Sequence, residues 1–112
     1  MSLPPKIKFE RATHPDWTPD EGYPVGPLVC CKIDNEWGLL HRDTGMLLYY
    51  YSSLARAMAE AEKCAKWPIW SKVIRKSKRS KPGDIHQPKD FGKKLAALAK
   101  RHHVEIGRRE ST

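Results

Sequence analysis

The residues best suited to chemistry in this chain are cations gathered in one short segment. Six of the twelve positions from Ser71 to Pro82 are Lys or Arg and none is acidic: Lys72, Arg75, Lys76, Lys78, Arg79 and Lys81. Six more cations of interest follow at Lys93, Lys94, Lys100, Arg101, Arg108 and Arg109. Because Lys and Arg donate charge-assisted hydrogen bonds to phosphate oxygens, the pattern indicates a binding site for a polyanion, with nucleic acid as the first candidate.

The net charge of +8 is distributed unevenly. Residues 1–66 hold eight Lys or Arg against nine Asp or Glu, a net charge of −1, whereas residues 67–112 hold thirteen against four, a net charge of +9. A neutral body with a basic appendage is typical of proteins that bind a polyanion. No apolar run approaches the roughly 20 residues that span a bilayer, and the first residues lack the apolar region of a secretory signal. We therefore expect a cytoplasmic protein without a membrane partner.

Other motifs favour structural roles over catalytic ones. The triplet His41-Arg42-Asp43 is similar to the HRD of protein-kinase catalytic loops, but the metal-binding Asn and the glycine loop of those enzymes are missing, so a turn is predicted there. His102-His103 has no nucleophile, paired carboxylate or third metal ligand at a recognisable spacing. The sequence thus predicts no catalytic residue and no enzymatic activity.

The cysteines predict neither disulfides nor a metal site. Cys30, Cys31 and Cys64 are an odd number of thiols, and neighbouring residues on a strand point to opposite faces. A zinc site needs four converging ligands, usually with a C-x-x-C or H-x(3–5)-H spacing that this chain lacks. We expect reduced thiols in the core, no metal and no cofactor.

A small antiparallel meander is predicted to precede the basic segment. Apolar and β-branched stretches, separated by turn residues, predict three strands over residues 28–33, 37–41 and 46–51. Loops of three or four residues join antiparallel neighbours. Strand alternation places Tyr49 and Tyr51 on one face, which is either covered by another segment or open for stacking on bases, and the candidate stacking residues are Trp37, Tyr49 and Tyr51.

Two helices follow this meander. Ser52 and Ser53 can cap a helix over residues 54–67, and Pro68 ends it. Its predicted apolar stripe includes Leu54, Ala57, Met58, Ala61, Cys64 and Ala65, with Arg56, Glu60 and Lys63 on the opposite side. A second helix is predicted over residues 90–103 with Asp90 as its cap. Its apolar face carries Phe91, Leu95, Leu98 and His102, and its back carries Lys93, Lys94, Lys100 and Arg101.

The remaining segments are harder to assign. Six of the nine prolines fall within residues 1–27, which predicts an extended arm with a short edge strand at 6–11 and one helical turn at 18–21. Residues 69–74 form either a fourth strand or an anchored extension, followed by a flexible basic connector. Residues 104–106 could add a short strand.

The expected fold is α+β, with a small antiparallel sheet of three to four strands, one helix packed on a face, then a basic connector and a C-terminal helix. The expected parts are a Pro-rich arm (1–27), a sheet-plus-helix core (28–70) and the basic connector with the C-terminal helix (71–112). The order of residues 28–67 resembles small sheet-plus-helix modules of bacterial, plasmid and phage proteins, among them the arm-binding domains of tyrosine recombinases. It names no family. Those domains read DNA with a basic sheet, whereas the predicted strands and turns here contribute only Lys32 and Arg42.

We therefore expect a non-enzymatic accessory or regulatory protein that binds DNA or RNA through its basic C-terminal segment, largely by phosphate contacts. The alternative is a protein-interaction module or inhibitor, of mobile-element or phage type, that docks on an acidic surface of a nucleic-acid-processing partner. The sequence does not decide whether the protein forms a homodimer through the second apolar face of the sheet.

Overall fold

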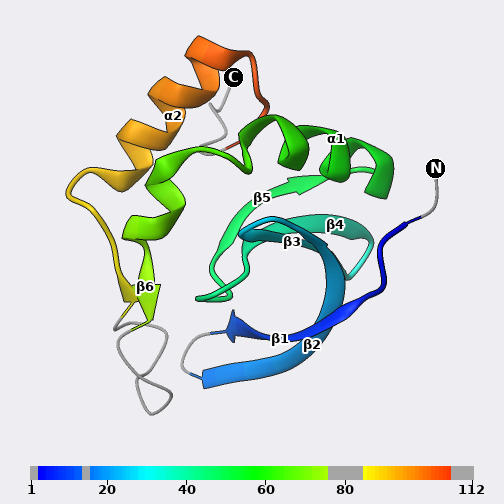
Figure 1. The fold of residues 1–112 in the computed structure, drawn as a ribbon. Helices are drawn as coiled ribbons and strands as arrows, with labels where there is room; N and C mark the ends of the chain where they lie inside the picture. The colour runs from blue at the N-terminus through cyan, green and yellow to red at the C-terminus, as the bar shows by residue number, and fades with distance from the viewer. Residues whose placement is uncertain (1–2, 14–15, 76–84, 107–112) are drawn as a thin grey trace.

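The described parts of the chain form a five-stranded sheet, two α-helices, one 3-10 helix and a short two-stranded ribbon (Figure 1). The computed structural model describes residues 3–13, 16–75 and 85–106. The elements are β1 (Ile7–Thr13), β2 (Asp16–Val25), β3 (Leu28–Ile33), β4 (Glu36–His41), β5 (Leu47–Tyr51), α1 (Leu54–Cys64), the 3-10 helix η1 (Pro68–Lys72), β6 (Ile74–Arg75), β7 (Ile85–His86) and α2 (Phe91–His102). Within these residues, no helix has the length and apolar character needed to cross a membrane.

The sheet is an antiparallel meander in the order β1-β2-β3-β4-β5. The α+β class is confirmed, and so are the three strands predicted between residues 28 and 51. The predicted strand number was too low, because the sheet has five strands rather than three to four. The two additional strands come from the proline-rich N-terminal segment, and β1 is an edge strand as predicted.

Strand β2 replaces the predicted arm and helical turn, despite its prolines. Residues 16–22 of β2 pair with β1, whereas residues 23–25 pair with β3. Pro19 lies in the first stretch and Pro24 in the second, so each proline has a ladder partner on one side only. Because proline lacks an N–H donor, it is tolerated where that position faces away from the neighbouring strand. The prolines therefore permit a strand that changes partners.

The curved sheet has a core on each face. On one face, α1 packs over Leu28, Cys30 and Leu39. On the other, Phe9 of β1 packs against a second cluster formed by Val29, Cys31, Ile33 and Leu40. Figure 1 shows α1 and the β1–β2 hairpin on opposite sides of β3 and β4. The N-terminal segment thus covers one apolar face of the sheet, whereas Tyr49 and Tyr51 lie in the cluster under α1 on the other.

The turn between β4 and β5 touches the far end of β1. The Ala12 N–H donates to the Gly45 carbonyl oxygen at 2.9 Å. Gly45 has a φ of +69°, and a Cβ at this position would overlap the carbonyl oxygen of Glu10. Glycine is required here because it alone meets both conditions without strain.

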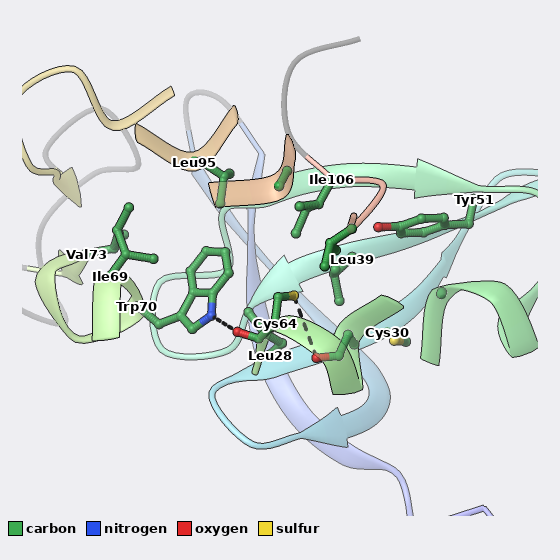
Figure 2. Packing of buried hydrophobic residues seen from close by; sticks show 14 of the residues in the cluster. Leu28, Cys30, Leu39, Tyr51, Cys64, Ile69, Trp70, Val73, Leu95 and Ile106 are labelled. Atoms are coloured by element: carbon green, nitrogen blue, oxygen red, sulfur yellow. Dashed lines mark hydrogen bonds between the residues drawn. The ribbon is translucent and has the colours of Figure 1, made fainter. Parts of the chain in front are cut away.

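Trp70 connects helix α1, η1 and the sheet (Figure 2). The residue is 2% exposed, and its Nε1–H donates to the Cys64 carbonyl oxygen at 2.7 Å. The Trp70 carbonyl in turn accepts from Nε2 of His41 at 2.9 Å. Residues 68–72 form a 3-10 helix rather than the alternative fourth strand. Helix α1 ends at Cys64 with Ala65 as its C-cap, so the predicted helix over residues 54–67 was too long and Pro68 lies beyond its end.

Helix α2 packs on the same core as α1. Phe91, Leu95 and Ala99 are buried in it, together with Val104 and Ile106 beyond the end of the helix. Residues 104–106 do not form the predicted strand. They are held by the backbone of Glu105, whose N–H donates to Oε2 of Glu60 at 2.8 Å and whose carbonyl accepts from the Tyr51 hydroxyl.

Candidate nucleic-acid interface

Helix α2 gathers four of the predicted cations on one exposed face. At about 100° per residue, Lys93, Lys94, Lys100 and Arg101 fall within about 120° of one another, with Ala97 at the centre. All five residues are exposed. The buried residues Phe91, Leu95 and Ala99 lie on the opposite side, so packing on the core fixes the direction of this face. We call the four cations the α2 basic face.

The ends of α2 differ from the sequence prediction. Asp90 precedes the helix with a left-handed φ of 57°, and its side chain makes no capping hydrogen bond. The prediction of an Asp90 side-chain cap was therefore wrong. At the other end His103 is also left-handed, and its N–H donates to the Ala99 carbonyl. His102, predicted on the apolar face, is exposed, with its ring centroid 5.5 Å from that of Trp67.

Lys72 lies across a shallow groove from the α2 basic face. The groove has a volume of about 340 Å³ and runs between η1 and α2. Its lining residues are Ile69, Lys72, Pro88, Lys94, Ala97 and Leu98. The structure thus places Lys72 of η1 and Lys94 of α2 on one groove, although they are far apart in sequence.

The ion pairs of the described residues leave these cations unmatched. The cations that pair with a carboxylate are Arg11, Arg56, Lys63 and Arg75. Lys72 and the α2 basic face have no ion-pair partner within the described ranges. Cations clustered without carboxylates create a positive potential that attracts a polyanion.

Arg75 differs from the other predicted contacts because it is engaged within the molecule. Its Nη1 donates to Oε1 of Glu10 at 2.8 Å, and its guanidinium carbon lies 3.8 Å from the centroid of the Trp17 ring. The side chain is only 14% exposed. This corrects the expectation that Arg75 offers its charge to a phosphate.

The remaining predicted cations fall outside the described residues. Lys76, Lys78, Arg79 and Lys81 belong to residues 76–84, and Arg108 and Arg109 to residues 107–112. The chain on either side of residues 76–84 is paired, since Ile74 and Arg75 of β6 face His86 and Ile85 of β7.

The aromatic residues proposed for stacking are mostly covered. Tyr51 is 3% exposed and donates its hydroxyl to the Glu105 carbonyl, so its proposed stacking role is wrong. Tyr49 is half-buried with its ring centroid 5.1 Å from that of Tyr51. Trp37 is also half-buried, 6.3 Å from the Tyr23 ring. These aromatics form no platform beside the α2 basic face.

The sequence pattern missed a charged cluster that joins α1 to residue 105. Glu60, predicted on the exposed side of α1, is 4% exposed. Besides the Glu105 N–H, its carboxylate accepts from Lys63 at 3.0 Å, and Arg56 pairs with both Glu60 and Glu105. The i,i+3 and i,i+4 spacing of Arg56, Glu60 and Lys63 does predict ion pairs along the helix. No feature of the sequence indicates that the distant Glu105 joins them.

His41 has a structural position in the turn at residues 41–44. Its Nε2 bonds the Trp70 carbonyl, which only accepts, so Nε2 carries the proton and Nδ1 accepts from the Thr44 hydroxyl at 2.8 Å. Burial lowers the pKa of His41, although the Trp70 bond and Asp43 oppose this. Both ring nitrogens are thus occupied within the fold.

The thiols are equally enclosed. Cys30, Cys31 and Cys64 are free and buried, and burial raises the pKa of each to about 12. They are therefore protonated at neutral pH. Among residues 3–13, 16–75 and 85–106, no three His, Cys, Asp or Glu side chains gather in a way that could hold a metal ion.

Comparison with known proteins gives no relative from which to transfer a function. No family model matches the chain, and neither a curated protein nor a solved structure shows significant similarity to it.

Proposed function

We propose that this protein is a non-enzymatic accessory or regulatory protein that binds nucleic acid through the α2 basic face and Lys72. The observation that carries the proposal is the gathering of four exposed cations on one face of α2, with Lys72 on the adjoining groove. Within the described residues none of these five cations forms an ion pair. A phosphate backbone supplies the missing negative charge.

The proposed contacts position the protein on the phosphate backbone. Lys and Arg that bind phosphate oxygens give affinity without reading a sequence, so we expect little discrimination between sequences of equal length. The cations of residues 76–84, which lie outside the described residues, are included in this proposal because the basic run continues directly from β6 in the sequence.

The direct experiment is a titration of the purified protein against a DNA duplex, a DNA single strand and a structured RNA at two salt concentrations. Changing Lys93, Lys94, Lys100 and Arg101 together to Gln removes four charges while keeping good helix formers. We expect the slope of log K against log salt to become less steep by about 3 to 4 for duplex DNA.

A matched variant controls for net charge. Lys6, Lys8, Lys32 and Arg42 are exposed cations of the N-terminal segment, the sheet and its turns, away from α2. Changing these four to Gln removes the same charge, and we expect a much smaller change in slope. Absence of binding to all three nucleic acids at low salt would contradict the proposal and favour docking on an acidic protein surface.

A further inference from the structure

The groove between η1 and α2 combines an apolar floor with a cationic rim. Ile69, which is 8% exposed, and Leu98 belong to or pack against the main core, so the floor is fixed by the fold. Pro88 and Ala97 complete its apolar lining, and Lys72 and Lys94 provide the charge. Its volume of about 340 Å³ lies within the range of small-ligand sites, about 300–1,000 Å³.

The charge of this groove separates it from two larger ones. The groove of about 740 Å³ beside β1 is lined by Glu10 and Asp43 together with Lys8, Arg42 and Arg75. The groove of about 430 Å³ beside Tyr23 is lined by Asp20 and Glu21 together with Lys6 and Lys32. In both grooves the carboxylates offset part of the positive charge that would attract phosphate. The described lining of the η1–α2 groove has no carboxylate. Its complement is a molecule with an apolar face and an adjoining anionic group.

We propose that this groove holds one unstacked base of a single-stranded nucleic acid, with the flanking phosphates on Lys72 and Lys94. The inference rests on the proposed function and names its substrate class. Lys94 belongs both to the groove and to the α2 basic face, so one strand can follow the face and place a base in the groove. A base in a duplex is stacked and paired, whereas a single strand or a loop exposes its faces.

Ala97 provides the test because it is exposed and lines the groove. Ala97→Leu adds bulk to the groove without changing charge or helix propensity appreciably. Ala59→Leu on α1 is the matched control, since Ala59 is also an exposed helical alanine but is not part of the groove lining. Thermal unfolding of both variants checks that the fold is kept.

The probes are a thymidine single strand of about 12 nucleotides, within the usual range of about 4–16 per site, and an abasic strand of equal length. Both carry the same phosphates, but only the first has bases. We expect the wild-type protein to bind the thymidine strand about tenfold more tightly, which corresponds to removing roughly 55 Å² of apolar surface from water on the groove floor. Ala97→Leu should reduce this ratio to near one, whereas Ala59→Leu should keep it.

The outcomes separate this inference from the proposed function. Equal affinity of the wild-type protein for both strands would overturn the base site while leaving phosphate binding intact, and this comparison needs no variant. A ratio that survives Ala97→Leu would also overturn it, because the base would then be bound elsewhere. Failure to bind either strand at low salt would overturn the base site, and failure with duplex DNA and structured RNA as well would overturn the proposed function.

Discussion

The guanidinium carbon of Arg75 lies 3.8 Å from the centroid of the Trp17 ring. This contact joins β6 to β2. The same guanidinium bonds Glu10 of β1 at 2.8 Å. A cation over an indole contributes about 0.5 to 2 kcal/mol, and a partly exposed ion pair about 0 to 1 kcal/mol. Arg75 therefore fixes the start of the basic segment against the N-terminal hairpin.

Replacing Arg75 by Gln should lower the free energy of unfolding by about 1 to 2 kcal/mol, because both contacts are lost. Urea unfolding measures this change. Affinity for nucleic acid should change little. Lys72→Gln is the companion variant: Lys72 is exposed, so its loss should weaken binding and leave stability unaltered. The reverse pattern would show that Arg75 contacts the polyanion.

Glu60 should make the protein sensitive to acid. Burial by itself raises the pKa of Glu60, but the Glu105 N–H, Lys63 and Arg56 together outweigh it and hold the pKa below the ordinary 4.5. The carboxylate therefore contributes stability that is present above pH 4.5 and is lost as the pH falls through the lower folded-state pKa. Chemical unfolding between about pH 5 and about pH 3 should show less pH dependence in Glu60→Gln than in the wild type. If the free energy of unfolding falls equally with pH in Glu60→Gln and in the wild type, this role of Glu60 is refuted.

His41 should act in a separate, higher pH range. Its pKa is lowered from 6.5 in the folded protein, mainly by burial, so the unfolded chain takes up a proton first as the pH falls. Stability should consequently decrease as the pH drops below 6.5 toward the folded-state pKa. His41→Gln removes this titration, and its unfolding free energy should stay nearly constant between about pH 7 and about pH 5. An unchanged slope in the variant would assign the effect to another histidine.

Gly45→Ala should be strongly destabilising. The left-handed φ costs about 1 kcal/mol, and the overlap with the Glu10 carbonyl also forces β1 to move. Gly26→Ala is the control. Gly26 has a similar φ of +57°, but an added Cβ would lie at an ordinary contact distance of 3.4 Å from the Cβ of Ala65, so this variant measures the cost of the left-handed conformation alone. We expect Gly45→Ala to lower the free energy of unfolding by at least about 2 kcal/mol more than Gly26→Ala does, as measured by urea unfolding. Equal losses of stability in the two variants would show that β1 moves away from the new methyl group at no cost.

Local patterns predicted the elements whose formation depends on nearby residues. Ser53 caps α1 through the Arg56 N–H, and β3, β4 and β5 follow their apolar stretches. Strand β2 was missed because proline is unfavourable in most central strands, and only the change of partner between Gly22 and Tyr23 makes Pro19 and Pro24 acceptable. That change is a tertiary feature without a local signal.

The candidate interface was predictable in composition but not in arrangement. Helical spacing alone placed Lys93, Lys94, Lys100 and Arg101 on one side of α2. The groove that joins Lys72 to this helix depends on how η1 and α2 pack on a shared core, which no spacing reveals. Likewise, nothing around Arg75 distinguished it from its basic neighbours, because Trp17 and Glu10 are distant in sequence.

The pairing of β6 with β7 makes this part of the molecule a natural insertion point for engineering. Arg75 and Ile85 face each other across the ribbon, and Arg75 is anchored independently by Trp17. Peptides grafted between these two positions would begin and end at neighbouring points, so α2 need not shift to accommodate them. Each doubling of the length of such a graft adds only about 0.6 kcal/mol of closure cost.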